Sequence, residues 1–555
     1  MANDPVGLQN PRRAQMFPAL TDGEVERLAA CGVERTFADG EVVFAQGDRQ
    51  VPFYIVLEGE MEIVHPRGGG EDLVTVHGRH EFTGEASLLL DRRSLVVGRA
   101  KGPLRVLRIE NARLRSLLQT DAGLSEIVMR AFILRRVGLV SSGFGDVVVV
   151  GSRNSASTLR LLAFLERNGH PHRYLDVDRD PEVQTILDQL KIEASRIPML
   201  VCCDRRVLYD PTDAEAAEVL GLNPALVPET VYDVVICGAG PGGLAAAVYG
   251  ASEGLDVLVV EAGSPGGQAA SSSKIENYLG FPTGVSGQAL AGRALAQAEK
   301  FGAKLAVARG AVRLRCDETP MRIELADGES IHARAIVVAT GAQYRKLDVP
   351  ELARFEGVGV YYAATAIEAQ RCGEDEVIVV GGGNSAGQAA TFLADRARHV
   401  HILIRGADLV ASMSRYLIRR IEETPNITLR RRTSVVALHG GEHLEAVSWR
   451  DDASGETTKH AVRHVFSMTG ASPNTRWLEG CVALDERGFV RTGPDVGSAL
   501  LQEWKWSLPR LPYLFETSHP RVFAIGDVRA NSVKRVASAV GEGSVCIQLV
   551  HKALE

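Results

Sequence analysis

The sequence predicts a multidomain α/β protein that is preceded by an all-β domain. Short strand-like segments with Gly at the turns fill residues 15–138. Strand and helix patterns then alternate over residues 146–222. Beyond residue 231, two units of strand, glycine-rich turn, helix and strand are typical of parallel, doubly wound sheets. At 555 residues the chain is long enough for three or four such domains, each with its own core.

Composition and charge exclude several classes of function. Apolar residues make up 45% and charged residues 24% of the chain, as in globular proteins in water. The net charge of −7 gives no basic field, so we expect no nucleic-acid partner and no anionic membrane partner. The N-terminus lacks the apolar core of a signal peptide, and no run of 18 apolar residues predicts a membrane span. The eight cysteines are scattered without a CxxC, which predicts reduced thiols in a cytoplasmic protein and no metal site.

Residues 15–138 predict a small β-barrel or jelly roll that is flanked by helices, one over residues 24–30 and one over 111–136. The segments FADGEVVFAQGD and FYIVLEGEMEIV resemble the cyclic-nucleotide-binding fold of catabolite activators and cyclic-nucleotide-dependent kinases. The resemblance implies that Glu85 binds a ribose hydroxyl and that Arg93 binds the cyclic phosphate. The loop is one residue shorter than in that family and differs on both sides of Arg93. The alternative is a barrel that has lost its ligand and serves for docking or dimerisation.

Residues 146–222 resemble a glutaredoxin or thioredoxin domain. Ile197-Pro198 stands where that family has its cis-proline, before a strand. The CxxC of the family would fall on Ser155-Ala156-Ser157-Thr158, and a hydroxyl has too high a pKa to replace a thiolate. Cys202 and Cys203 follow the proline on a strand and fit a core better than a catalytic site. We therefore expect a degenerate domain without disulfide chemistry, retained as a scaffold.

The first glycine fingerprint lies between residues 231 and 261. Gly238, Gly240 and Gly243 have GxGxxG spacing between two apolar strands, and Glu261 ends the second strand. Such glycines permit a tight turn, let the backbone approach a pyrophosphate, and let helix and strand pack closely. The acid at the end of the second strand is placed for a ribose hydroxyl. These features together predict a Rossmann-like dinucleotide site.

Several downstream motifs resemble those of the low-molecular-weight bacterial thioredoxin reductases. The resemblance implies an FAD-binding domain formed by residues 231–346 and 472–555. The motifs are a GGQ segment paired with Glu-Asn, an ATG segment, a Gly-Asp pair and a triplet at a helix start. The expected FAD-binding residues in them are Gly267, Gln268, Asn277, Thr340, Gly341, Gly526, Asp527, Arg535, Val536 and Ala537.

A second fingerprint within residues 350–470 predicts an NAD(P)-binding domain. The expected binding residues are Gly381, Gly383, Asn384, Ser385 and Ala386, with Ala at the third fingerprint position. The next strand ends at Arg405 rather than at an acid. An Arg suits a 2′-phosphate, which favours NADPH over NADH.

The redox dithiol of the resembled family is missing. Aligned on Ala-Thr, its two cysteines are replaced by Ala363 and Ala366. A methyl group can neither attack a disulfide nor form a flavin adduct, so no certain catalytic side chain remains. Tyr361 and Tyr362 either border the space left beside the flavin or simply pack in the strand.

The sequence as a whole predicts an FAD-dependent NAD(P)H oxidoreductase of thioredoxin reductase architecture. Hydride passes from NADPH, or NADH, to the flavin and then to an acceptor that the sequence does not identify. A cyclic nucleotide is the expected regulatory ligand, and the resemblance implies a homodimer. Three alternatives stay open: a disulfide reductase that uses a partner's cysteines, a flavin-based ligand or redox sensor, and an oxidase or dehydrogenase of an organic substrate.

Overall fold

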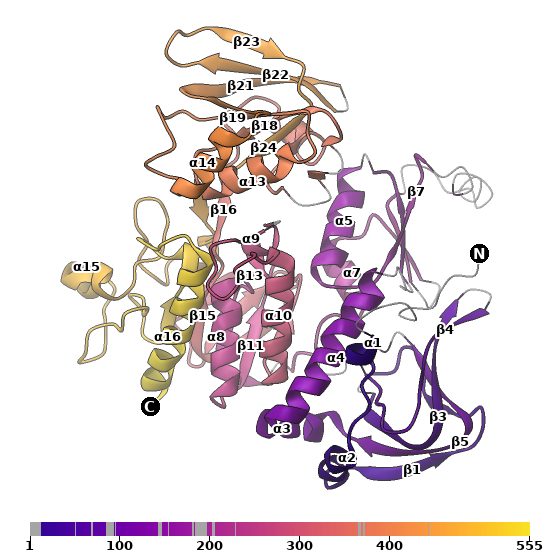
Figure 1. Cartoon of the computed structure of the whole chain (residues 1–555). Coiled ribbons are helices and arrows are strands. Elements are labelled where there is room, and N and C mark those ends of the chain that lie inside the picture. The colour runs from indigo at the N-terminus through magenta and orange to yellow at the C-terminus, as the bar shows by residue number, and fades with distance from the viewer. Residues whose placement is uncertain are drawn as a thin grey trace.

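Four units make up the structure, a computed structural model of the whole chain (Figure 1). We name them the N-terminal barrel (residues 13–141), the small α/β domain (147–222), the first fingerprint domain (231–346 and 472–555) and the second fingerprint domain (350–470). The described residues are 13–49, 51–67, 70–84, 94, 96–141, 147–153, 155–179, 183, 197–202, 206–227, 229–272, 274–364, 368–369, 372–441 and 443–555.

The N-terminal barrel is an antiparallel sheet in the order β1-β5-β3-β4, with β2 also paired to β5. Its strands are β1 (Val33–Phe37), β2 (Val42–Phe44), β3 (Phe53–Arg67), β4 (Gly70–His77) and β5 (Val97–Ile109). Helix α1 (Arg13–Met16) precedes α2 (Asp22–Ala29). Thr21 and Glu24 form a capping box at the start of α2, where the sequence predicts a helix.

The predicted helix over residues 111–136 is in fact two helices, α3 (Asn111–Thr120) and α4 (Ala122–Ser141). The chain breaks at Asp121, which leaves the helical conformation and accepts a hydrogen bond from the Leu124 N–H at 3.0 Å. Helix α4 is 20 residues long. Even so, within the described ranges no helix combines the length and the apolar character that crossing a membrane requires.

The small α/β domain has a four-stranded sheet in the order β7-β6-β8-β9. Its elements are β6 (Val148–Gly151), α5 (Ala156–Arg167), β7 (Arg173–Asp176), β8 (Met199–Val201), β9 (Val207–Tyr209) and α7 (Asp213–Val219). Strand β6 runs parallel to β7 and antiparallel to β8, and the Ile197–Pro198 bond is cis, as expected. The sequence also predicts a helix over residues 181–190 in this domain, and of these residues only Val183 is among the described ones.

The first fingerprint domain is built on a seven-stranded sheet in the order β12-β11-β10-β15-β14-β13, with β26 beside β15. The strands are β10 (Val231–Cys237), β11 (Val257–Val260), β12 (Lys304–Ala306), β13 (Ala311–Arg315), β14 (Met321–Leu325), β15 (Ser330–Val338) and β26 (Val522–Ala524). Its main helices are α8 (Pro241–Ser252), the short α9 (Gly267–Ala270), α10 (Gly287–Lys300) and α16 (Val536–Leu554). Apolar strand residues share one core with α8, α10 and α16, as parallel strands buried on both faces require.

The second fingerprint domain lies above the first in Figure 1. Its parallel sheet has the order β17-β24-β18-β19-β20 and is accompanied by the three antiparallel strands β21-β22-β23. The elements are α11 (Leu352–Phe355), β17 (Val360–Tyr361), β18 (Glu376–Val380), α13 (Asn384–Ala394), β19 (His399–Leu403), α14 (Arg415–Glu423), β20 (Ile427–Arg430), β21 (Thr433–Gly440), β22 (Leu444–Asp451), β23 (Thr457–His460) and β24 (His464–Ser467). The chain enters the second fingerprint domain after β16 (Ala342–Tyr344) and leaves it at β25 (Ala471–Pro473), and these two strands pair as an antiparallel ribbon.

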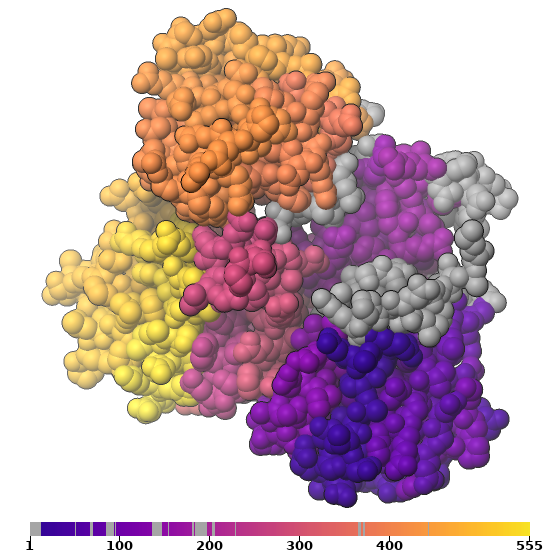
Figure 2. Space-filling model, viewed as in Figure 1, coloured from indigo at the N-terminus to yellow at the C-terminus, as the bar shows by residue number. Residues whose placement is uncertain are grey.

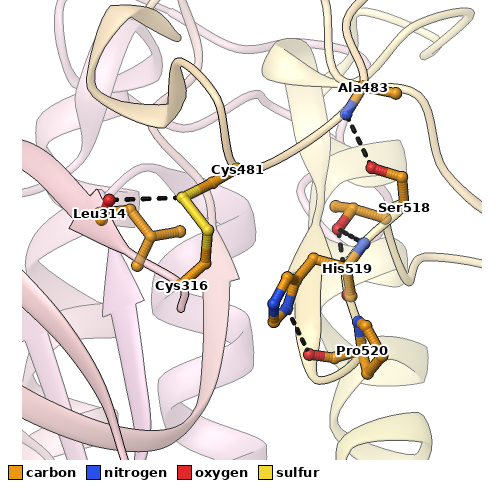
Figure 3. Close-up of a disulfide and its surroundings, with 8 residues drawn as sticks. Leu314, Cys316, Cys481, Ala483, Ser518, His519 and Pro520 are labelled. Carbon is orange, nitrogen blue, oxygen red and sulfur yellow. Dashed lines mark hydrogen bonds between the residues drawn. A yellow bond between two sulfur atoms is a disulfide. The ribbon is translucent and has the colours of Figure 1, made fainter. Parts of the chain in front are cut away.

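A disulfide between Cys316 and Cys481 corrects the expectation that all cysteines are reduced (Figure 3). Cys316 follows β13, and Cys481 follows the return from the second fingerprint domain, 165 residues later. No short-range spacing marks such a pair, because only folding brings the two segments together. Of the other cysteines, Cys31, Cys237 and Cys546 are free, and Cys202 is buried in the core as expected. Cys203 lies outside the described residues.

The sequence also indicates an insert over residues 500–512 in the return to the first fingerprint domain, and this segment forms a structured excursion. Helix α15 (Gly497–Glu503) leads into it. The Trp506 indole N–H donates to the carbonyl oxygen of Arg510 at 2.6 Å. The Arg510 guanidinium in turn forms a bidentate ion pair with Glu516, whose carboxylate is fully buried. The insert is therefore fixed to the first fingerprint domain by a charge-assisted contact.

Candidate cofactor site

The first fingerprint turn can be built only with glycine at two positions. Gly238 has φ +110°, and a Cβ there would lie 2.3 Å from the carbonyl oxygen of Ala339. A Cβ at Gly243 would lie 1.9 Å from the carbonyl oxygen of Gly238. Gly240 is the N-cap of α8, and a Cβ there would meet no atom within 4 Å. The turn thus presents open backbone at a helix N-terminus, where a pyrophosphate binds.

One cavity of about 880 Å³ extends from this turn across the domain. Nearly all of the residues that the sequence predicts for FAD line it: Gly238, Gly240, Glu261, Gly267, Gln268, Asn277, Thr340, Gly341, Gly526, Asp527, Arg535, Val536 and Ala537. Gly243 does not, because it lies behind the turn in the contact of helix and strand. The volume is within the range of cofactor pockets, and the glycine cradle leaves the space a dinucleotide needs, so the residues fit FAD.

Glu261 ends β11 and binds the backbone of the turn. Its Oε2 accepts a hydrogen bond from the Ala239 N–H at 2.7 Å, and Oε1 accepts one from the Gly263 N–H at 2.9 Å. Burial raises the pKa of Glu261, while these backbone hydrogen bonds act in the opposite direction. The backbone of Ala262 bonds to the same carboxylate, so of its about four lone-pair positions one remains for a ribose hydroxyl.

The Gly-Asp pair lines the same cavity and lies between β26 and α16 in the chain. The Gly526 N–H donates to Glu542 at 2.6 Å, and Arg529 pairs with the same carboxylate. Burial raises the pKa of Asp527, and the charge of Lys534 lowers it. Lys534 also lines the cavity and donates to the Asp527 carbonyl oxygen at 3.0 Å. Sequence reasoning missed this lysine, although it directly precedes the predicted Arg535.

The ATG segment is joined to the returning chain. The Thr340 hydroxyl donates to the Asn474 carbonyl oxygen at 2.8 Å, and the Asn474 amide donates to the Thr340 carbonyl oxygen at 2.9 Å. Asn474 and Trp477 both line the cavity, and neither is among the predicted site residues. Their position directly after the predicted domain crossing is the signal that could have identified them.

The second fingerprint opens onto the same cavity. Gly381 has φ +144°, and a Cβ there would lie 2.3 Å from the Met468 carbonyl oxygen. Gly383 is the N-cap of α13, and Ala386 is fully buried under the helix. The first two residues of α13, Asn384 and Ser385, line the cavity that the FAD residues line. The start of α13, where the second dinucleotide turn ends, therefore lies at the edge of the predicted flavin site.

Arg405 is exposed directly after β19, where the sequence predicts contact with a 2′-phosphate. Two further arginines lie nearby that sequence reasoning missed. The Arg432 N–H donates to the Gly406 carbonyl oxygen at 3.1 Å, so the turn after β20 lies against the turn after β19. Arg431 and Arg432 are both exposed there. Their run of basic residues was visible in the sequence, but the contact between the two turns was not.

Ala363 lines a smaller cavity of about 60 Å³ between the two fingerprint domains. Gln268 and Ser385 line both this cavity and the larger one. The two tyrosines before Ala363 differ. Tyr361 is buried against Phe466, whereas Tyr362 lines the small cavity and donates to Glu356 at 2.6 Å. Ala366 lies outside the described residues.

The predicted cyclic-nucleotide residues Glu85 and Arg93 lie outside the described residues. The preceding segment is held by Arg135 of α4, which is buried. Its guanidinium donates to the carbonyl oxygens of Phe82 and Gly84 at 3.0 and 2.7 Å. The start of the predicted ligand loop is thus bonded to the helix that leads toward the rest of the chain.

Two dinucleotide turns that open onto one cavity define an oxidoreductase that pairs a flavin with a nicotinamide nucleotide. Comparison with known proteins agrees. Residues 232–543 match the family model of pyridine nucleotide-disulphide oxidoreductases, and residues 34–121 match that of cyclic nucleotide-binding domains. The chain belongs to the pyridine nucleotide-disulphide oxidoreductase family, and its N-terminal barrel is a domain of the cyclic nucleotide-binding type.

The similar proteins are thioredoxin reductases. That of Mycolicibacterium smegmatis is 33% identical over 316 residues, covering 57% of this chain and 94% of the relative. That of Bacillus subtilis is 31% identical over 328 residues, covering 59% of this chain and 96% of the relative. The crystal structure of Lactococcus lactis thioredoxin reductase in its FR conformation matches with a TM-score of 0.52 at 27% identity, covering 58% of this chain and 99% of that one. The chain is thus an FAD-dependent NAD(P)H oxidoreductase of thioredoxin reductase type, a family whose cofactors are FAD and NADPH.

Proposed function

We propose that this protein transfers electrons from NADPH through FAD directly to an external acceptor, without a dithiol of its own. The observation that carries the proposal is the shared cavity. Asn384 and Ser385, at the start of α13, line the space that the FAD residues line. Hydride transfer requires the two rings in contact, and this arrangement brings the two binding turns to one space.

The chain's own groups bind and orient the cofactors. Backbone N–H groups at the start of α8 would bind the pyrophosphate, Glu261 a ribose, and Asp527 the ribityl chain. Gln268 and Asn277 line the same cavity, and Gln268 also lines the small cavity together with Ser385, so the flavin ring would lie beside Gln268. FAD supplies the acceptor of a hydride and its two electrons, while the protein positions it and limits access of water.

The position where Ala363 and Ala366 replace the two cysteines of the resembled family, here called the small-residue site, decides how electrons leave the flavin. Ala363 lies where the resembled family has a cysteine, and a methyl group cannot carry electrons to a disulfide. The flavin itself would therefore pass both electrons to a quinone or to oxygen, or pass them one at a time to two molecules of an iron–sulfur or other one-electron redox protein. The exposed Arg405 and Arg432 support NADPH as the donor, because arginine binds a 2′-phosphate with charge-assisted hydrogen bonds.

Anaerobic titration of the flavin tests this proposal. NADPH should bleach the flavin faster than NADH does, and one of the acceptor classes should restore its colour. Thioredoxin with a disulfide dye should give no turnover. Turnover with thioredoxin would overturn the proposal in favour of a disulfide reductase that uses a partner's cysteines. Failure of both nucleotides to bleach the flavin would favour a sensor.

For the N-terminal barrel we propose binding of a cyclic nucleotide through Glu85 and Arg93. Support comes from the family match and from Arg135, which links Gly84 to α4. Titration calorimetry with cyclic AMP and cyclic GMP tests it, and the absence of heat with both would leave a docking or dimerising domain. A homodimer is proposed from the resemblance alone, and light scattering of the purified protein checks its mass. A cytoplasmic location is proposed from the scattered cysteines of the sequence.

A further inference from the structure

The small α/β domain contacts both fingerprint domains through one helix. Helix α5 has 12 residues, which at 1.5 Å per residue makes it about 18 Å long. In Figure 1 it stands beside α9 and α10, with its upper end near the second fingerprint domain. Figure 2 shows the purple surface of this domain filling the side of the molecule between the orange second fingerprint domain and the indigo barrel. No part of the proposed function uses this domain.

The C-terminal end of α5 is bonded to the first fingerprint domain. The Arg167 guanidinium donates to the Ser271 hydroxyl at 3.0 Å, and the Asn168 amide donates to the Ser264 hydroxyl at 3.0 Å. The Gln288 amide donates to the Glu166 carbonyl oxygen at 3.1 Å. Ser271 also lines the small cavity beside Ala363. This end of α5 therefore touches the wall of the redox site.

Apolar packing strengthens the same attachment. Leu161, Leu165 and Leu222 of the small domain belong to one continuous core with Ala298 and Val307 of the first fingerprint domain. Every residue of this group is at least nine-tenths buried. A shared core cannot open without exposing apolar surface, so the two domains form one body.

The N-terminal end of α5 reaches the second fingerprint domain. Ser155 caps the helix, and Ala156 follows it. A Cβ at Gly357 would lie only 3.2 Å from the Cβ of Ala156, so the two backbones are in close contact. Gly357 stands between α11 and β17, and β17 leads directly to Tyr362 and Ala363. The contact therefore lies on the segment that carries the small-residue site.

Covalently, the two fingerprint domains are joined only by the two-stranded ribbon of β16 and β25. Rotation of one domain about this ribbon would move Gly357 relative to Ser264 and Ser271. Helix α5 is bonded to the serines and packed on Gly357, so such a rotation would break one of its two attachments.

We propose that the small α/β domain is a brace that holds the fingerprint domains in the arrangement where α13 opens onto the flavin site. Turnover then proceeds without domain rotation. The small α/β domain would serve as this brace rather than in disulfide exchange. The inference rests on the proposed function, because it assumes that hydride transfer occurs in this arrangement.

A cross-link between the two ends of the contact tests the brace. In the full-length flavoprotein Ala156→Cys with Gly357→Cys, oxidation should join the introduced thiols, as peptide mapping by mass spectrometry would show. The cross-linked protein should be reduced by NADPH within twofold of the wild-type rate. A tenfold slower reduction that recovers when the cross-link is reduced would show that the domains must separate, and would overturn the proposal. The Ala156→Cys variant treated alike controls for reduction of Cys316–Cys481.

Gly357 has φ +81°, so a cysteine at this position strains the backbone. A second experiment therefore leaves Gly357 unchanged. Ser264→Ala with Gln288→Ala removes two attachments of α5 outside both cavities. Amide hydrogen exchange at the C-terminal end of α5 should become about tenfold faster, whereas Ser252→Ala, at an exposed serine elsewhere, should change nothing. Unchanged exchange would overturn the brace. If NADPH fails to bleach wild-type flavin, the proposed function fails, but the exchange measurement, which needs no turnover, still decides whether the brace exists.

Discussion

Substitution of Gly243 by Ala is the sharpest perturbation of the FAD site. The new Cβ would lie 1.9 Å from the Gly238 carbonyl oxygen, whereas such contacts are almost never shorter than 3.0 Å. The start of α8 would have to move by about 1 Å from the strand end, and hydrogen bonds of about 2.9 Å from its N–H groups to a pyrophosphate would stretch beyond bonding distance. Loss of two charge-assisted hydrogen bonds at about 1.5–3 kcal/mol each predicts FAD affinity at least 100-fold weaker.

The assay is FAD content after purification, followed by titration of the apoprotein with FAD. Gly292→Ala is the matched control, because Gly292 is exposed in the middle of α10 and a Cβ there meets no atom within 4 Å. This control should keep its FAD and gain about 0.5–1 kcal/mol of stability. Full FAD content in Gly243→Ala, with a Kd within threefold of wild type, would refute the assigned role of this glycine.

Three further predictions follow from single contacts. Burial and the charge of Glu368 raise the pKa of Glu166. The native state therefore binds this proton more tightly than the unfolded chain does, and the protein loses stability as pH rises. Glu166→Gln should therefore stabilise the protein by up to about 1 kcal/mol at pH 8 and less at pH 5, measured by thermal unfolding at both values. Cys316→Ser opens a loop of 165 residues, for which chain entropy sets a ceiling of about 5 kcal/mol on the stability lost in denaturant unfolding. Arg405→Ala with Arg432→Ala should raise the KM for NADPH about tenfold or more and leave that for NADH unchanged; equal effects on both would contradict contact with the 2′-phosphate.

Local patterns predicted the parts of the site that depend on neighbouring residues. Gly243 is needed because a Cβ there would clash with the Gly238 carbonyl oxygen five residues earlier, so the spacing of these two glycines is informative by itself. Gly238 and Gly381 instead meet backbone of distant strands, at Ala339 and Met468. Contacts between distant segments gave no such signal. The Cys316–Cys481 disulfide and the pairing of Arg432 with Gly406 depend on how strands far apart in the chain come together. Helix limits differ for local reasons: the sequence predicts a helix that starts at Thr158, whereas the Ser155 cap starts α5 at Ala156, two residues earlier.

The ion pair between the two fingerprint domains contributes little to holding them in one arrangement. Arg420 of α14 forms an ion pair with Glu276 of the first domain at 2.8 Å, and the Arg420 side chain is half exposed. Burial raises the pKa of Glu276, but Arg420 and Lys274 outweigh it and lower the pKa. An exposed pair contributes about 0–1 kcal/mol, which is too little to hold two domains by itself. The ribbon allows rotation, so the shared core under α5 and its contact at Gly357 are the features large enough to prevent it. A chain without a dithiol has no need to present one, and a fixed arrangement then becomes an advantage for hydride transfer.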